Sequence, residues 1–104
     1  MVAKVCFMVR AVVADATDRP GFDRWYQTEH LPDAVARFGA RRGWRCWSRI
    51  DPSVHYAFYK FADLAEAQAV LDSPELRALV AEFDWAWGAR VARTRDLIEA
   101  VGTT

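Results

Sequence analysis

The chain has 104 residues, of which 53% are hydrophobic and 27% are charged, which is the length and composition of a single globular domain spanning residues 1–104. Its 14 basic and 14 acidic side chains give zero net charge, which argues against binding to nucleic acid or to an anionic membrane surface. No apolar run approaches the roughly 20 residues that span a bilayer, and the N-terminal residues lack the pattern of a secretory signal, so we expect a cytoplasmic protein.

The first two predicted elements are a strand and a helix. Residues 2–13 are apolar except at Lys4 and Arg10 and are rich in β-branched side chains, which predicts a strand covered on both faces. Residues 18–30 then predict a helix, because Asp18 can cap its start and Pro20 falls in its first turn.

Proline at position 32 interrupts this helical pattern. Pro32 has no N–H to donate and disfavours helical backbone at Leu31, so we expect a break or kink. A second short helix should restart at Pro32 and end at Gly39, a residue type that readily adopts the left-handed conformation of a helix C-terminus.

The remaining elements follow from their turn and cap residues. Residues 43–50 and 54–62 predict two strands of a hairpin around the turn Asp51-Pro52-Ser53. Residues 63–72 predict a helix that opens with a capping box, and Ser73-Pro74 begins another, which Gly88 ends. Residues 89–101 predict the last strand.

The predicted order βαββαβ is that of an α+β ferredoxin-like sandwich, in which a four-stranded antiparallel sheet carries its helices on one face. Right-handed crossovers put both helical segments on the same side. The other face also looks apolar, because Cys6, Met8 and Val12 alternate with Val5, Phe7 and Val9, and because Tyr56 and Phe58 alternate with Ala57, Tyr59 and Phe61. A second copy packed sheet against sheet would cover it, so we predict a homodimer.

The two cysteines do not form a recognisable site. Cys6 and Cys46 are forty residues apart and have no CxxC spacing, so we expect buried, reduced thiols and no metal site or disulfide. No glycine-rich phosphate loop or nucleophile elbow is present.

The segment FDRWYQTEHLPD, together with the element order, resembles the EthD-like group of the dimeric α/β-barrel superfamily. The resemblance covers nearly the whole chain. It implies a small apolar or aromatic ligand in a cleft between the sheet and the helices. It leaves the chemistry open, since this superfamily includes cofactor-independent monooxygenases, polyketide cyclases, muconolactone-type isomerases and haem-dependent chlorite dismutases.

The pair Glu29-His30 is the candidate catalytic site. Each residue lies four positions after an aromatic residue, Trp25 or Tyr26, which predicts that the pair lines the same cleft. His30 would act as a general base or acid, with Asp33 or a strand side chain as its partner, because adjacent helical residues diverge by about 100°. The alternative is that His30 caps the carbonyls left unpaired where Pro32 interrupts the helix.

Trp25, Tyr26, Arg10 and His55 are the candidate ligand-binding residues. Trp25 and Tyr26 either pack in the core or form an aromatic pocket wall. Arg10 is either half of an ion pair or an anchor for a substrate carboxylate. His55 begins a strand beside a turn, and its position favours surface exposure.

Four arginines surround Trp44 and Trp47 in the sequence: Arg41, Arg42, Arg45 and Arg49. The zero net charge of the chain favours a solvated edge strand here over a surface that stacks nucleic-acid bases.

Two functions remain open. One is a cofactor-independent enzyme that transfers a proton through His30 in a cyclisation, isomerisation or oxygenation. The other is a non-catalytic protein that only holds a small aromatic or polyketide-like molecule.

Overall fold

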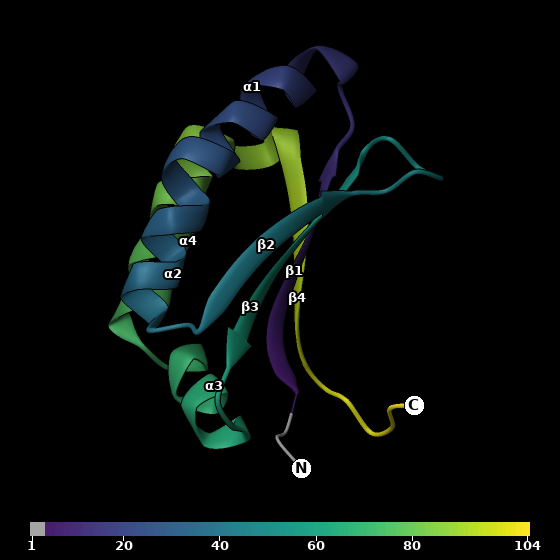
Figure 1. Ribbon diagram of the computed structural model, residues 1–104. Coiled ribbons are helices and arrows are strands. Elements are labelled where there is room, and N and C mark those ends of the chain that lie inside the picture. The colour runs from purple at the N-terminus through teal and green to yellow at the C-terminus, as the bar shows by residue number, and fades with distance from the viewer. Residues whose placement is uncertain (1–3) are drawn as a thin grey trace.

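A computed structural model describes residues 4–104. Its sheet has four strands, β1 (Val5–Val13), β2 (Arg42–Trp47), β3 (Val54–Phe61) and β4 (Val91–Glu99), in the order β2-β3-β1-β4. Every neighbouring pair is antiparallel, and all the helices lie on one side of the sheet (Figure 1). The predicted ferredoxin-like arrangement is therefore confirmed.

The helices occupy the two crossovers. Between β1 and β2 lie η1 (Ala16–Asp18), α1 (Arg19–Trp25), η2 (Tyr26–His30) and α2 (Leu31–Phe38). Between β3 and β4 lie α3 (Leu64–Leu71), α4 (Pro74–Ala86) and η3 (Gly88–Arg90). At the later helices the caps are present: the Asp63 carboxylate accepts a hydrogen bond from Glu66 N at 2.8 Å and Ser73 Oγ accepts one from Leu76 N at 3.1 Å, and Gly39 ends α2 with a φ of 64°. Asp18 precedes α1 as predicted, but its side chain makes no capping hydrogen bond.

Pro32 changes the helical hydrogen-bond pattern and does not end the helix. Residues Tyr26–His30 form a turn of π-helix, in which the Leu31 N–H donates to the Tyr26 carbonyl five residues back. In a regular α-helix the Pro32 ring would meet the carbonyl of Thr28 without donating to it, and the wider turn avoids that conflict. The chain therefore runs on into α2, so the predicted break is replaced by a local widening at the Glu29-His30 pair.

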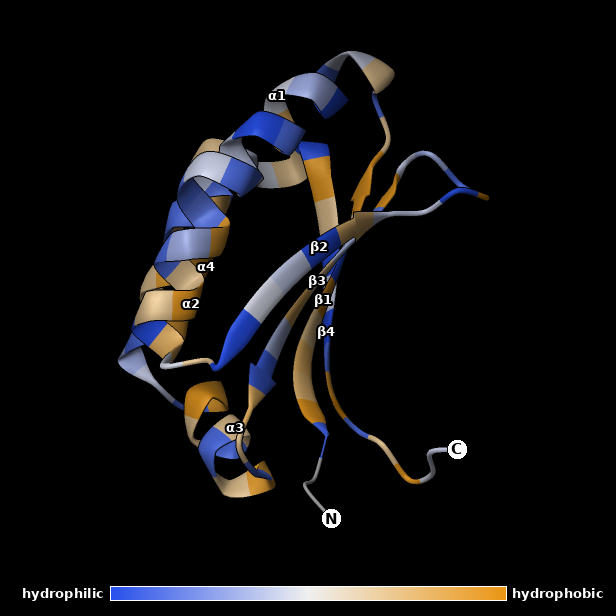
Figure 2. Cartoon of the chain, in the orientation of Figure 1, coloured by the Kyte–Doolittle hydropathy of each residue, from blue (hydrophilic) through white to orange (hydrophobic). Residues whose placement is uncertain are grey.

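The two faces of the sheet differ in burial. Along β1 the residues alternate strictly between buried and half-buried, with the odd-numbered ones facing the helices. Figure 2 shows hydrophobic residues along β1 and hydrophilic ones on the outward side of α1. The helices pack closely at Gly43, where an added Cβ would lie 2.4 Å from Val35 Cγ2, so only glycine leaves room for α2 against β2.

The opposite face of the sheet is uncovered and carries both cysteines. Cys6 is half-buried and Cys46 is exposed, so the prediction that both thiols are buried is wrong. The reason is the strand alternation, which turns both toward the face without helices. On the same face the rings of Trp44 and Phe58 stack with centroids 5.4 Å apart. No helix within residues 4–104 is long and apolar enough to cross a membrane.

Candidate functional site

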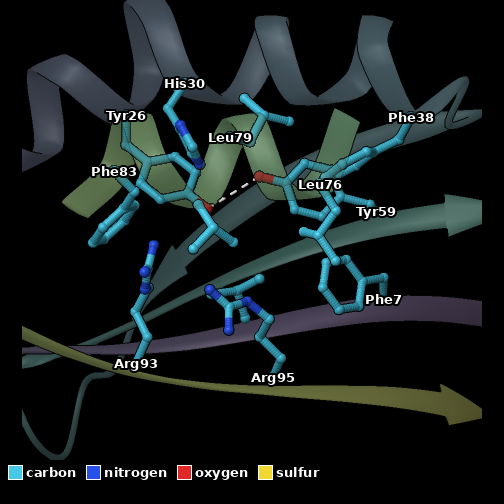
Figure 3. Close-up of a pocket in the computed structure, with 12 residues that line it drawn as sticks. Phe7, Tyr26, His30, Phe38, Tyr59, Leu76, Leu79, Phe83, Arg93 and Arg95 are labelled. Carbon is cyan, nitrogen blue, oxygen red and sulfur yellow. Dashed lines mark hydrogen bonds between the residues drawn. The ribbon is translucent and has the colours of Figure 1, made fainter. Parts of the chain in front are cut away.

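A cavity lies between the sheet and the helices, where the sequence predicts a cleft. Its volume is about 20 Å³, the space of about one water molecule, so an aromatic ligand could enter only if the lining side chains moved apart. Its walls are mainly apolar side chains of β1, α2 and α4, and five polar side chains also reach it, as Figure 3 shows: Tyr26, His30, Tyr59, Arg93 and Arg95.

The two tyrosines form a hydrogen-bonded pair in the cavity wall. Their hydroxyl oxygens are 3.0 Å apart, although the residues are 33 positions apart in the chain. Burial raises the pKa of Tyr26 to about 12, and burial also raises the pKa of Tyr59 well above its usual range. Both phenols therefore keep their hydrogens at neutral pH. One hydrogen makes the bond between them, which leaves the other to donate to a ligand.

His30 lies among aromatic rings at the edge of the same cavity. Its ring stacks on Trp25 at 4.7 Å with an interplanar angle of 20°, and it meets Tyr26 and Phe83 edge-on at 4.8 and 5.6 Å. Burial, reinforced by the positive charge of Arg93, lowers the pKa of His30 to about 4. The imidazole is therefore neutral at pH 7 and can accept a proton.

The helix-cap interpretation of His30 is wrong. The helix continues through this position, and His30 makes no side-chain capping hydrogen bond. The expected Asp33 partner acts only through its charge, which opposes the lowering of the His30 pKa by burial and by Arg93. Within residues 4–104, no hydrogen bond fixes the imidazole, and aromatic packing alone orients it.

Glu29 and His30 line an outer groove together, but only His30 also lines the cavity between the sheet and the helices, where the sequence predicts the cleft. Glu29 is exposed and does not reach the cavity. It borders an outer groove between the first helical segment and α4, with a volume of about 310 Å³, that Trp25 and His30 also line. His30 is thus the partition between the cavity and the outer groove, because consecutive helical residues point in directions about 100° apart.

His55 is buried and does not reach the surface, so that prediction is also wrong. It is 1% exposed, because β3 turns it under α1, where its ring contacts Phe22 and Tyr26 with centroids 5.2 and 4.7 Å away. Burial and the charge of Arg45 lower the pKa of His55 to about 3, so it is neutral. Its Nδ1 has no hydrogen-bond partner among the described residues, and the side chain does not line the cavity.

Arg45 is also placed differently from the prediction, which put it on a solvated edge strand. Its side chain is 13% exposed and its guanidinium forms an ion pair with Asp23. It also donates to His55 Nε2 and to Gln27 Oε1, both at 3.1 Å, while Trp47 Nε1 donates to the same Asp23 oxygen at 2.7 Å. The network ties β2 and β3 to α1, and local sequence gave no sign of it.

Arg10 does not join this group. Its even position in β1 places it on the uncovered face, opposite Tyr56 and Thr94 in the neighbouring strands. Among residues 4–104 it makes no ion pair within 4.0 Å, so neither the intrachain ion pair nor a role in the cavity is supported.

Trp25 and Tyr26 both pack in or against the core, and each also lines a hollow. Tyr26 is 1% exposed and packs against Phe22, and its hydroxyl reaches the cavity. Trp25 is half-buried and reaches only the outer groove.

Sequence reasoning missed Tyr59, Arg93 and Arg95. The strand alternation of residues 91–97 was the available signal, because it places both arginines on the helix-facing side with Val91 and Leu97. Within the described part of the chain, no group of three or more metal-binding side chains occurs.

Comparison with known proteins supports the fold. No protein-family model matches this chain, and no curated protein sequence does. Among solved structures, a variant of SnoaB, a cofactor-independent oxygenase from Streptomyces nogalater, superposes with a TM-score of 0.68 at 17% identity over 96% of this chain and 95% of that one.

Two further structures have the same fold. An ethyl tert-butyl ether degradation (EthD) family protein from Bacillus halodurans gives a TM-score of 0.65 at 14% identity, covering 96% of this chain and 99% of that one. A protein of unknown function from Nitrosomonas europaea gives 0.64 at 23% identity, covering 99% and 94%. The resemblance to EthD-like, dimeric α/β-barrel proteins is confirmed at the level of the fold.

Proposed function

We propose that this chain, which shares the fold of EthD-family and cofactor-independent oxygenase structures, binds a small aromatic or polyketide-like molecule between its sheet and helices and uses His30 as a base. The observation that carries the proposal is the position of a neutral imidazole at the edge of a largely apolar cavity, beside two protonated phenols. This combination suits removal of a proton from an acidic C–H or O–H group.

The tyrosines would stabilise the product of that step. Proton removal leaves negative charge on an oxygen of the ligand, and the free tyrosine hydrogen can donate to it in a largely apolar site. The imidazole, with a pKa of about 4, is a weak base. Its strength would increase beside an anion, because negative charge favours the imidazolium form.

The ligand site itself is tested by titrating 2-naphthamide, a neutral aromatic molecule, followed by calorimetry and by the NMR signals of Trp25 and Tyr26. We expect saturable binding that Leu76→Trp removes, because Leu76 lines the cavity and the larger ring would fill it. Leu71→Trp makes the same change on an exposed side chain of α3 and should bind as the wild type does. Equal binding by both variants would place the ligand elsewhere.

The role of His30 as a base is tested separately, by deuterium exchange at the acidic carbon next to the carbonyl of 2-tetralone in heavy water. We expect exchange faster than in buffer with the wild type. His30→Gln, which keeps a polar side chain of similar size, should bind the ketone and lose the acceleration. Binding without accelerated exchange in the wild type would favour the second function, a non-catalytic binding protein, for which the absence of a bonded partner for His30 is the supporting observation.

We also propose that two copies pair through the uncovered face of the sheet. This face carries partly exposed apolar side chains from all four strands: Met8, Trp44, Tyr56, Phe58 and Ile98. An apolar patch of this kind is rarely left exposed to water. Phe58 lies between Met8 and Trp44 in register, at the middle of the patch.

Light scattering should accordingly give about twice the chain mass of 11.8 kDa at micromolar concentration. Phe58→Asp puts a charge into the middle of the patch and should give the monomer mass. Leu71→Asp, on the exposed surface of α3, should leave the mass unchanged. A folded wild-type monomer would contradict the proposal.

A further inference from the structure

Two arginines on β4 extend from the sheet into the cavity. Arg93 and Arg95 pair with Ala11 and Val9 of β1, two buried residues that face the helices, so both arginines lie on the helix-facing side of the sheet. Both line the cavity, and Figure 3 shows both side chains pointing toward it from the strand. Two cations at a largely apolar cavity need counter-charges or solvent.

Arg93 has its counter-charge within the chain. Its guanidinium is 2.5 Å from an Asp84 carboxylate oxygen and lies over the Phe83 ring, 3.8 Å from the centroid. The side chain is 11% exposed, so the ion pair and the ring hold it in one place.

Arg95 has no such partner. Among residues 4–104, no carboxylate lies within 4.0 Å of its guanidinium and no hydrogen bond uses its donors. In the part of the chain that the structure describes, no Asp or Glu lines the cavity. The cavity therefore presents hydrogen-bond donors and one uncompensated positive charge, with the neutral imidazole of His30 at its edge.

We propose that Arg95 binds the carboxylate of an aromatic acid whose ring occupies the cavity, an inference that rests on the proposed binding function. A guanidinium presents paired N–H donors that match the two oxygens of a carboxylate. The apolar walls suit the ring, and the spare tyrosine hydrogen suits an oxygen on it.

Selectivity follows from the missing counter-charge. A neutral molecule that covered Arg95 would remove the cation from water without replacing its interactions, which opposes binding. A carboxylate replaces the interactions that the guanidinium loses with water. The ligand class should therefore be acids, with neutral molecules of the same shape binding more weakly.

The competing interpretation is that Arg95, which is exposed, only extends its charged end into solvent while its stem covers apolar surface. In that case the charge of a ligand in the cavity would matter little. The two interpretations differ in one measurable quantity, the ratio of affinities for an acid and its amide.

The experiment measures by calorimetry the Kd of 2-naphthoate, ionised at pH 7, and of 2-naphthamide, its neutral counterpart of nearly the same shape. The wild type should bind the acid more tightly by about tenfold or more, and this preference should weaken as salt is raised. Arg95→Met keeps the apolar stem and should bring the two values to within about twofold. Arg24→Met removes the same charge from the exposed side of α1 and should keep the preference.

Equal affinities for the acid and the amide in the wild type would overturn the role of Arg95 and leave the aromatic site standing. An unchanged acid preference in Arg95→Met would do the same. Absence of saturable binding for both compounds would overturn the aromatic site and this inference together. Circular dichroism of the variants confirms that each is folded before its affinities are compared.

Discussion

Lowering the pH from 7 to 4 should reduce the free energy of unfolding by several kcal/mol. His30 and His55 have pKa values lowered to about 4 and about 3, from 6.5, mainly because burial disfavours their charged forms. The charges of Arg93 and of Arg45, respectively, act in the same direction.

The sign of the effect follows from proton uptake. Between pH 6.5 and about 4 the unfolded chain protonates both histidines while the folded chain protonates neither, so the unfolded state binds more protons and stability falls as the pH falls. Each histidine contributes up to about 1.4 kcal/mol per pH unit within its window. The total from pH 7 to pH 4 is on the order of 6 kcal/mol, a large part of the roughly 5 to 15 kcal/mol of a typical domain.

Urea unfolding at a series of pH values checks this expectation. His30→Phe keeps a flat ring against Trp25 and removes one titrating group, so its stability should fall about half as steeply between pH 6 and pH 4. A stability that stays constant between pH 7 and pH 5 in the wild type would contradict the burial of both neutral imidazoles.

Phe22→Ala should destabilise the protein by about 3 to 5 kcal/mol, the range for removal of a fully buried phenylalanine. Phe22 has no exposed surface, and six aromatic rings lie within 6.2 Å of its ring centroid: Trp25, Tyr26, Trp47, His55, Phe83 and Trp87. Because these rings come from five elements of the fold and from Trp87 after α4, they cannot all close the cavity that alanine would leave.

Chemical denaturation at pH 7 measures the loss, with Trp85→Ala as the matched control. Trp85 is 91% exposed, so its removal should change stability by less than about 0.5 kcal/mol. The change at Phe22 should also weaken 2-naphthamide binding, because this cluster holds Tyr26 and the π-helical turn against the sheet. A cost below about 1 kcal/mol would mean that the aromatic cluster is not tightly packed.

The sequence by itself determined the elements and their order. Pro20 and Pro74 mark helix starts, Gly39 marks a helix end, and the alternation of β1 separates two faces, all of which are local properties of the chain. The aromatic and Glu-His segment located His30 correctly at the edge of the cavity, because helical spacing carries Tyr26 and His30 to neighbouring positions.

Only the tertiary structure decided which polar groups meet. The hydroxyls of Tyr26 and Tyr59 come together because α1, η2 and β3 pack against each other, and no local pattern links residues 33 positions apart. His55 is at the start of a strand, where exposure is common, yet α1 covers it.

The same holds for the charges. Alternation assigns Arg45 and Arg95 to a face of the sheet, but the sequence does not say which side chains the covering helices bring to that face. Packing gives Arg45 the carboxylate of Asp23 and, among residues 4–104, places none within ion-pair distance of Arg95. The physical reason is range: backbone preferences act over a few residues, whereas burial and ion pairing depend on side chains that only the completed fold brings within a few ångströms of each other.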